Sequence, residues 1–452
     1  MKRWDPQQIA HACGAELLHA PPELRGGPQL ISIDSRDAAP GVLFVGLPGE
    51  RVHGGDFAGA ALAAGAWGVL STPQHTRGLS GGVVLAAQDP LAALQKLAGA
   101  WRRELGASVI GVTGSTGKTS TKDLLRAVLA PQRRTVASRQ NFNTEIGLPL
   151  QILSAEQGTE VLVLEMAMRG AGQIAQLAAI AQPDVGVIVN IAPVHLEQLG
   201  SLEAIAAAKA ELLAALPPGA TAVVPAVEPL LEPHLREDLE VLRFGAGGDV
   251  QLVAETEHEV TVQLLGERLR LGVNFAEAHL RQNLLAAVAA AHAVGVRAGG
   301  AIELERAAGR GERHHLPGSV TLFDDCYNAN PASMRAALTE LGRNAQRARS
   351  SGSVRTVAVL GDMLELGPDA AAYHAQIGSH ADAVVDVLVT VGPLAAGMAA
   401  AFHAEHHHAH DAAQAAQLLP ALLAPGDLVL VKGSNGVGLR LVCDTLLGTV
   451  AA

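Results

Sequence analysis

Short runs of apolar residues recur along the chain, and most of them end at a glycine or a polar residue. A continuous apolar run, rather than an alternating one, predicts a strand that is buried on both faces, as in a parallel sheet. In the middle of the chain such runs lie at 108–112, 161–166, 185–190 and 221–225. Residues 250–273 alternate between apolar and polar positions instead, which predicts antiparallel hairpins, and a helix is expected over 277–294.

The parts of the chain before and after this middle region also contain short apolar runs, separated by stretches that predict helices. Residues 41–47 and 81–87 predict strands. The stretches 57–66 and 90–105 predict helices, so the first part of the chain is expected to form a small α/β unit. After a break near 316–319, four apolar strands end in acidic residues, glycine or lysine. Such strand ends are typical of a second nucleotide-binding sheet, whose ligands lie at the carboxyl ends of the strands.

An α/β protein of three domains is therefore expected. These are a small N-terminal α/β domain over 1–106, a central parallel-sheet domain over 107–316 and a Rossmann-like α/β domain over 317–452. The length of 452 residues agrees with this at ~150 residues per domain. Only 3% of the residues are aromatic although 49% are hydrophobic, so the cores must consist of Ala, Leu and Val.

The charge balance disfavours a nucleic-acid partner. The chain has 33 basic and 44 acidic residues, a formal net charge of −11, whereas phosphate backbones are bound by clustered cations. The N-terminus lacks the apolar run of a signal peptide, and ~18 consecutive apolar residues, enough to span a membrane, occur nowhere. We therefore expect a soluble, cytoplasmic protein with no membrane span.

Two features are expected to carry no chemistry. Cys13, Cys326 and Cys443 are widely spaced and show no CxxC pairing, so neither a disulfide framework nor a zinc site is expected. The His-rich stretch 403–410 is expected to be a solvated turn rather than a metal site.

The clearest candidate for chemistry is the glycine-rich segment 111–121, between an apolar strand and a helix. Gly114 and Gly117 allow the backbone to turn and to direct N–H groups toward phosphate oxygens, and the start of the helix adds a partial positive charge. Lys118 can neutralise the β- and γ-phosphates, and the Thr119 hydroxyl can bind Mg²⁺. The candidate nucleotide contacts are Thr113, Gly114, Ser115, Thr116, Gly117, Lys118 and Thr119.

This segment is a variant of the phosphate-binding loop. The pattern GxxxxGK[ST] fails because Val112 occupies the position of its first glycine. The dinucleotide pattern GxGxxG fails because the glycines are Gly111, Gly114 and Gly117, so a hydride-transfer enzyme is disfavoured. A glycine turn with an incidental lysine is also disfavoured, because strand, glycine spacing and helix coincide.

Three later residues, in separate segments, stand out by their position or their surroundings. Glu165 ends an apolar strand on the side of the phosphate loop, where a carboxylate can bind Mg²⁺, although an isolated acid there is usually just solvated. His195 taken alone would be a packed or exposed loop histidine. Lys209 falls in the apolar stripe of a helix, at i+4 from Ile205 and i−3 from Leu212. A lysine there must extend to solvent, pair with an acid or be modified.

Polar side chains also follow the first strand of the third domain. They are Asp325, Tyr327, Asn328 and Asn330. Acid and amide groups can hold ribose hydroxyls and orient phosphates, whereas an Asx-rich turn is the alternative. Asn283, in the helix expected over 277–294, would by itself be a helix-capping or surface amide.

The segment TGSTGKT at 113–119 resembles the ATP-binding signature of the Mur ligase and folylpolyglutamate synthase superfamily. The resemblance to Mur ligases covers nearly the whole chain, in order. It is carried by the segments 34–57, 141–150, 165–174, 190–212, 324–338, 359–367 and 429–439. NFNTEIG at 141–147 and DDCYNANP at 324–331 are similar to the Mur ligases that add D-alanyl-D-alanine, with Cys326 where serine is usual.

The resemblance implies what each domain does. The first would bind UDP, the central P-loop domain would bind ATP, and the Rossmann-like domain would close on the nucleotide and on D-alanyl-D-alanine. The implied reaction is ATP-dependent addition of this dipeptide to UDP-N-acetylmuramoyl-tripeptide, through an acyl phosphate, in peptidoglycan synthesis. ATP and Mg²⁺ are the implied cofactors, and a monomer is expected. Closure around three substrates predicts a hinge near 313–318.

The resemblance also implies roles for individual residues. Lys118, Lys209 and His195 would be catalytic, with Lys209 carbamoylated. The implied magnesium ligands are Thr119, Glu165, His195 and Lys209. Asn283 would border the adenine and Arg310 would reach the phosphates. The implied nucleotide contacts from the third domain are Asp325, Tyr327, Asn328 and Asn330. The implied substrate contacts are Ser35 and Arg36, at the uridine diphosphate, and Asn141, Asn143 and Thr144.

Two alternatives stay open. Another amide ligase of the superfamily, such as a folylpolyglutamate synthase, is disfavoured by the first domain, because folate ligases begin at the phosphate loop. A P-loop switch or binding protein without amide chemistry is disfavoured by Lys209 and by the second sheet with its polar strand ends.

Overall fold

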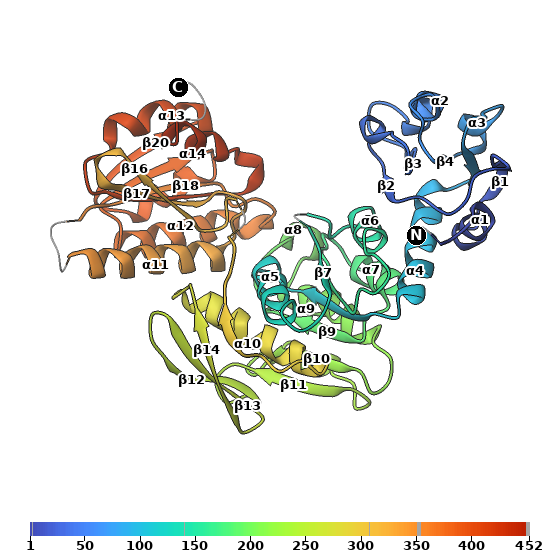
Figure 1. Ribbon diagram of the computed structural model, residues 1–452. Coiled ribbons are helices and arrows are strands. Elements are labelled where there is room, and N and C mark those ends of the chain that lie inside the picture. Colours follow the sequence, from blue (N-terminus) through green and yellow to red (C-terminus); the bar gives the residue numbers. More distant parts are fainter. Residues whose placement is uncertain (2, 140, 307, 350–353, 449–452) are drawn as a thin grey trace.

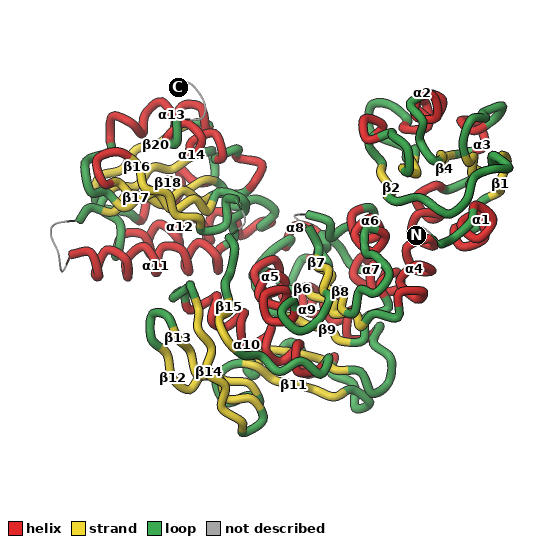
Figure 2. Tube along the Cα trace, viewed as in Figure 1, coloured by secondary structure: helices red, strands yellow, loops and turns green. Residues whose placement is uncertain are grey.

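The structure, a computed structural model, describes residues 1, 3–139, 141–306, 308–349 and 354–448. Three sheets follow one another along the chain, and Figure 1 shows three lobes, with the N-terminal and C-terminal lobes on opposite sides of the central one. In each lobe helices lie beside the strands (Figure 2). Among the described residues, no helix combines the length and the apolar character that crossing a membrane requires. The expected α/β fold in three parts is confirmed.

The first lobe is built on a five-stranded sheet in the order β1-β5-β4-β3-β2. Its strands are β1 (Glu16–His19), β2 (Leu30–Ser32), β3 (Val42–Val45), β4 (Gly68–Ser71) and β5 (Val83–Ala86). Only β1 is antiparallel to its neighbour. The helices are α1 (Pro6–Cys13), α2 (Ala58–Ala63), α3 (Pro73–Thr76) and α4 (Pro90–Leu105). The Asp89 side chain caps the N-terminus of α4, and Gly106 in the left-handed conformation ends the helix at its C-terminus.

Trp101 anchors α4 to the central lobe. Its indole Nε1–H donates to the carbonyl of Ala155 at 2.9 Å, and its ring meets that of Trp4 edge-on. Because Trp101 is 1% exposed, Trp101→Phe leaves a buried carbonyl without its donor. The expected loss in the free energy of unfolding is about 1–3 kcal/mol, measured by urea denaturation with circular dichroism.

The matched control for this substitution is Trp4→Phe, which keeps an aromatic ring at the contact and is expected to change the stability much less. Equal unfolding midpoints for the parent protein and Trp101→Phe would show that the hydrogen bond contributes nothing.

The central lobe contains a ten-stranded sheet in the order β15-β14-β13-β12-β11-β10-β9-β6-β8-β7. Its strands are β6 (Ser108–Thr113), β7 (Thr135–Ala137), β8 (Val161–Glu165), β9 (Val185–Ile188), β10 (Thr221–Pro225), β11 (Glu240–Phe244), β12 (Val250–Glu255), β13 (Glu259–Leu264), β14 (Glu267–Val273) and β15 (Gly300–Ile302). Its helices are α5 (Lys118–Leu129), α6 (Gly147–Leu153), α7 (Gln173–Ala181), α8 (Leu196–Leu199), α9 (Leu202–Ala214) and α10 (Ala278–Ala293).

The parallel strands of this sheet are covered on both faces. Along β8, Val161 and Val163 belong to the core under α5 and α10, whereas Leu162 and Leu164 belong to the core shared with α4, α6 and α7. Alternate side chains of a strand point to opposite faces, so a continuous apolar run fills two cores at once. This explains why these strands show no polar alternation in sequence.

The third lobe contains a six-stranded sheet in the order β16-β17-β21-β18-β19-β20. Its strands are β16 (Glu312–Leu316), β17 (Val320–Asp325), β18 (Thr356–Gly361), β19 (Val387–Val391), β20 (Glu405–Ala409) and β21 (Leu428–Lys432). The pairs are parallel except β16 with β17. Its helices are α11 (Pro331–Arg349), α12 (Ala370–Asp382), α13 (Ala412–Leu422) and α14 (Arg440–Leu446).

Three local expectations can be compared with these elements. The antiparallel hairpins expected over 250–273 are confirmed as β12, β13 and β14. The His-rich stretch 403–410 is not a turn, because most of it forms the edge strand β20, which pairs with β19. Most of the segment 313–318, where a hinge is expected, belongs to the paired strand β16, which runs beside β17 from Glu312 onward, and the hinge stays a prediction. The connection between the second and third sheets lies before that strand.

Candidate active site

The phosphate loop joins β6 to α5 at the carboxyl ends of the central strands. Gly114 (φ 156°) and Gly117 (φ 75°) have backbone conformations that favour glycine. At Gly117 a second reason applies, since an added Cβ would lie 2.8 Å from the side-chain oxygen of Asn283. The loop can therefore approach α10 only because this position has no side chain.

Asn190, two residues after the end of β9, holds the loop in place. Its side-chain oxygen accepts the N–H of Thr116 at 2.9 Å, and its Nδ2 donates to the Thr116 hydroxyl at 2.8 Å. The Ser115 hydroxyl donates to the carbonyl of Ala192 at 2.9 Å. Sequence reasoning missed Asn190, although a polar residue at the end of an apolar run was the available signal.

Lys118 lies at the start of α5, folded back over the loop. Its Nζ donates to the carbonyl of Gly114 at 2.7 Å. Burial lowers the pKa of Lys118, the charge of Glu165 raises it, and Arg310 lowers it further. Arg310 therefore lies close enough to Lys118 for their charges to interact, and a shared contact with the phosphates stays a prediction.

Glu165 is the centre of a set of oxygen ligands. It is 2% exposed at the end of β8, and its two carboxylate oxygens accept the Thr119 hydroxyl at 2.9 Å and Asn143 Nδ2 at 2.8 Å. A carboxylate and a hydroxyl beside a phosphate loop suit the preference of Mg²⁺ for hard oxygen ligands. The residues at this position therefore fit a magnesium ion bound next to a nucleotide.

His195 directly precedes α8 and has a positive φ of 54°. Its Nδ1 is hydrogen-bonded to the carboxylate of Glu365, which comes from the third lobe. Burial lowers the pKa of His195, and Glu365 opposes this by raising it. The contact joins the second and third lobes, and neither residue's sequence context indicated it.

Lys209 is buried in α9, with 2% of its surface exposed, so its amine does not extend to solvent. Burial holds the pKa of Lys209 well below its usual value, and the charge of Lys118 lowers it further. Among the described residues, no carboxylate forms an ion pair with it. Of the three options that the apolar stripe left open, modification is the one that this environment favours.

Side chains after β17 form the opposite wall. Lys432, 3% exposed at the end of β21, donates from Nζ to the carboxylate of Asp325 at 2.7 Å and to the carbonyl of Asn328 at 2.9 Å. The guanidinium of Arg310 stacks over the Tyr327 ring at 4.0 Å. Lys432 was missed as a site residue, although a lysine that closes an apolar strand was a visible signal.

Asn330 has a structural task, because its side-chain oxygen accepts the N–H of Ser333 at 2.9 Å near the start of α11. Such a cap gives the side-chain oxygen a structural partner, as the alternative of an Asx turn anticipated, and a role of Asn330 toward a nucleotide stays a prediction. Thr113 likewise directs its buried hydroxyl into the fold, where it donates to the carbonyl of Met166 at 2.9 Å.

The walls enclose a cleft of about 1350 Å³ between the second and third lobes. Most expected site residues line it: Ser115, Thr116, Gly117, Lys118, Thr119, Asn141, Asn143, Thr144, Glu165, His195, Asn283, Arg310, Asp325, Tyr327, Asn328 and Asn330. Five do not: Ser35, Arg36, Thr113, Gly114 and Lys209. Cleft-lining residues from two lobes form the kind of site in which domain closure assembles the catalytic groups.

Ser35 and Arg36 lie in the first lobe, in the short 3-10 helix Ser35–Asp37. The side chain of Arg36 is 87% exposed and donates from Nε to Asp34 at 2.9 Å. The structure therefore places these two residues on a separate lobe, apart from the cleft. A substrate that contacts both regions has to extend from one lobe to the next.

The amide of Asn283 is buried beside the loop, and its Nδ2 has no hydrogen-bond partner among the described residues. A buried donor without an acceptor costs free energy, so a ligand atom is its natural partner. The structure places this amide directly against Gly117, which excludes the helix-capping and surface alternatives.

Three protein families match consecutive parts of the chain. They are the Mur ligase family catalytic domain over residues 29–97, the Mur ligase middle domain over 112–291 and the Mur ligase glutamate ligase domain over 309–435. The UDP-N-acetylmuramoyl-tripeptide–D-alanyl-D-alanine ligase of Mycobacterium tuberculosis is 37% identical over 495 aligned residues, covering 97% of this chain and 97% of that protein.

Two solved structures are similar over almost the same extent. MurF from Acinetobacter baumannii has a TM-score of 0.84 at 28% identity, with 98% of this chain and 99% of that chain covered. MurF ligase from Thermotoga maritima, in complex with ADP, has a TM-score of 0.79 at 28% identity, with 92% and 96% covered. Sequence and structure thus agree over nearly the full length, and the chain belongs to the Mur ligase family.

Proposed function

We propose that this protein is the ATP-dependent ligase that joins D-alanyl-D-alanine to UDP-N-acetylmuramoyl-tripeptide in peptidoglycan synthesis. The observation that carries the proposal is the cleft, in which the phosphate loop with Lys118 faces polar groups of a second nucleotide-type sheet. The name of the Mycobacterium tuberculosis relative, which matches over the whole chain, supports the choice of substrates.

The reaction begins with an attack by the terminal carboxylate of the tripeptide on the γ-phosphorus of ATP. An acyl phosphate forms and ADP leaves. The free amine of the dipeptide then attacks the acyl carbon, phosphate leaves, and the amine loses its proton to solvent or to the departing phosphate. The chain's main contribution is to position the reactants and to stabilise negative charge on the transferred group.

Lys118 and the N–H groups of the loop are assigned to the β- and γ-phosphates, with Arg310 reaching the same oxygens from the linker side. Thr119, Glu165, His195 and a carbamate on Lys209 would hold Mg²⁺. When bound, this ion offsets the charge of the phosphates. Glu165 already accepts the Thr119 hydroxyl, so these two ligands need little rearrangement.

The remaining expected residues are assigned to binding. Asn283 is assigned to the adenine, which would give its unpaired Nδ2 an acceptor. Four residues of the third lobe are assigned to the ribose and phosphates: Asp325, Tyr327, Asn328 and Asn330. Ser35 and Arg36 are assigned to the uridine diphosphate, and Asn141, Asn143 and Thr144 to the peptide-bearing substrate.

The decisive experiment is an assay of phosphate release from ATP. Release is expected only when the UDP-linked tripeptide and D-alanyl-D-alanine are both present. Release that depends on a folate and glutamate would favour the folylpolyglutamate synthase alternative. Release without either acceptor would favour a P-loop protein that performs no amide chemistry.

Nucleotide and UDP-linked peptide together are expected to make the protein more compact. The assigned groups lie on three lobes, and Ser35 and Arg36 are apart from the cleft, so simultaneous contact requires the lobes to move together. Small-angle scattering with a non-hydrolysable ATP analogue plus UDP-N-acetylmuramoyl-tripeptide measures this as a smaller radius of gyration. An unchanged radius with both ligands bound would contradict the prediction.

A further inference from the structure

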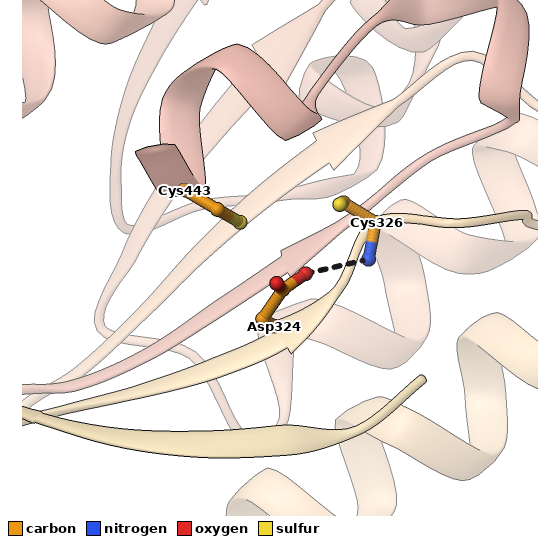
Figure 3. Close-up of side chains that lie close together, drawn as sticks. All are labelled: Asp324, Cys326 and Cys443. Carbon is orange, nitrogen blue, oxygen red and sulfur yellow. Dashed lines mark hydrogen bonds between the residues drawn. The ribbon is translucent and has the colours of Figure 1, made fainter. Parts of the chain in front are cut away.

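Two cysteines and an aspartate converge inside the third lobe, away from the groups assigned to catalysis. The ligand atoms of Asp324, Cys326 and Cys443 all lie within 4.8 Å of one another. Asp324 and Cys443 are 0% exposed and Cys326 is 3% exposed. Figure 3 shows the two sulfurs facing each other, with the carboxylate beside them.

The fold explains this convergence. Asp324 lies in β17 and Cys326 directly follows its last residue, and in extended chain a spacing of two places both side chains on the same face. Helix α14 packs over that face and brings Cys443 to it, within the same apolar core as Cys326. Cys326 and Cys443 are far apart in sequence, which argued against a zinc site, but the fold brings them close together.

The donor set is the kind that zinc binds. Two thiolates with a carboxylate or imidazole suit a soft tetrahedral cation, whereas Mg²⁺ and Ca²⁺ prefer oxygen ligands alone. Zinc bonds of about 2.0–2.3 Å place the ligand atoms of a tetrahedron roughly 3.3–3.8 Å apart. Separations within 4.8 Å therefore reach this geometry through side-chain movements of about 1 Å.

A second group of metal-type ligands adjoins the first and shares Asp324. Glu312 and His314, on the paired strand β16, also have ligand atoms within 4.8 Å of the Asp324 carboxylate. The Nε2 atom of His314 is buried and makes no hydrogen bond to any described residue. It lies 3.5 Å from the Glu312 carboxylate, an ion-pair distance when the imidazole is protonated. With no hydrogen bond, this nitrogen is a candidate fourth donor, independent of the cysteines.

The local charges are compatible with a divalent cation. Arg440 donates to the Asp324 carboxylate at 2.6 Å, and Asp444 lies 4.0 Å from the same guanidinium. Zinc and Arg440 together would balance the two thiolates and the carboxylate. A disulfide is the competing use of the two sulfurs, but oxidants react with exposed thiolates and both sulfurs are buried.

We propose that Asp324, Cys326 and Cys443 form a structural zinc site, with His314, whose ligand atom lies near the Asp324 carboxylate, as the candidate fourth donor. Each sulfur–zinc bond replaces a sulfur–hydrogen bond, and the protons pass to solvent. The ion would fasten α14 to the end of β17, directly before Tyr327 in the wall of the cleft. This site is separate from the magnesium site and does not depend on the proposed ligase activity.

The test uses the full chain, stripped of metal and titrated with Co²⁺ as a spectroscopic substitute for zinc. We expect about one Co²⁺ per chain with the near-ultraviolet absorption of cobalt–thiolate bonds, abolished by added Zn²⁺. This absorption distinguishes the site from the His-rich strand β20, because histidines bind cobalt without thiolate bands.

Cys326→Ser and Cys443→Ser are each expected to remove most of the thiolate absorption. Cys13→Ser is the matched control, because Cys13 is also a buried free cysteine but lies in the first lobe. It is expected to bind cobalt as the parent does. Equal thiolate absorption in the parent and in both variants of the cluster would overturn the proposal, as would its absence from the parent.

A second measurement needs no variant. The thermal unfolding midpoint of the stripped parent is expected to rise when an equivalent of Zn²⁺ is added, because a ligand that binds only the folded state stabilises it. Intact-mass measurement of the protein purified without reductant checks the alternative. A mass lower by two hydrogens, with no metal uptake, would show a Cys326–Cys443 disulfide and overturn the zinc assignment.

Discussion

Lys118→Ala is expected to reduce the rate of ligation by about a hundredfold to a thousandfold. Lys118 is the cation placed by the phosphate loop, and in the structure its Nζ already lies against the carbonyl of Gly114. Groups that stabilise charge on a transferred phosphoryl are worth about 10²–10³ in rate each, or roughly 4 kcal/mol at the upper end. Because burial lowers the pKa of Lys118, a bound phosphate would also help to keep it charged.

The measurement is steady-state phosphate release with both acceptor substrates at saturation, with circular dichroism to verify folding. Lys96→Ala is the control, because Lys96 is exposed on α4 and does not line the cleft. Lys118→Ala with the parental rate would mean that the loop does not bind the transferred phosphate, and the site assignment would fail.

Lys209→Arg is expected to be nearly inactive. A carbamate forms when a neutral amine adds to CO₂ and releases one proton, so the lysine must be deprotonated first. A lysine near its ordinary pKa of ~10.4 is almost wholly charged at neutral pH. Burial holds the pKa of Lys209 well below that value, so its amine is available. Arginine keeps the length and the charge but cannot form the carbamate.

A second substitution separates chemistry from packing, because an arginine in this buried place can also disturb the fold. Lys209→Ala is expected to be inactive and to regain part of its activity with a short-chain carboxylate, which can occupy the vacated anion position. A lysine with a purely structural role would not produce this rescue. If Lys209→Arg under saturating substrates matches the parent enzyme, the modification hypothesis is wrong.

Local features of the chain were predictable because their causes are local. The strand before the phosphate loop, the left-handed glycines and the start of α5 all follow from residues within the segment 108–121. The apolar neighbours of Lys209 on its helix face were likewise predictable from the helical period. These features needed no information about distant parts of the chain.

Contacts between distant segments were not predictable in this way. The pairs His195–Glu365 and Lys432–Asp325 join residues whose proximity depends on how lobes and strands are ordered. The meeting of Cys326 with Cys443 has the same origin, and sequence spacing argued against it. Strand β20 was missed because its histidines carry little β-propensity, and its pairing with β19 outweighs that.

Helix α10 can carry only small side chains where it faces the central sheet, and this affects the cleft. It contains a run of alanines, Ala286, Ala287, Ala289, Ala290 and Ala291, that are all 0% exposed, between α5 and the central strands. Methyl groups lose no rotamer freedom on burial, so the helix lies close to the sheet at no such entropic cost. Because the helix lies so close to the sheet, there is no room for a larger side chain at these alanines. A bulkier residue would overpack the layer, at about 1–3 kcal/mol, and would displace Asn283 from Gly117. The alanine methyl groups of α10 thus set the distance between this helix and the phosphate loop.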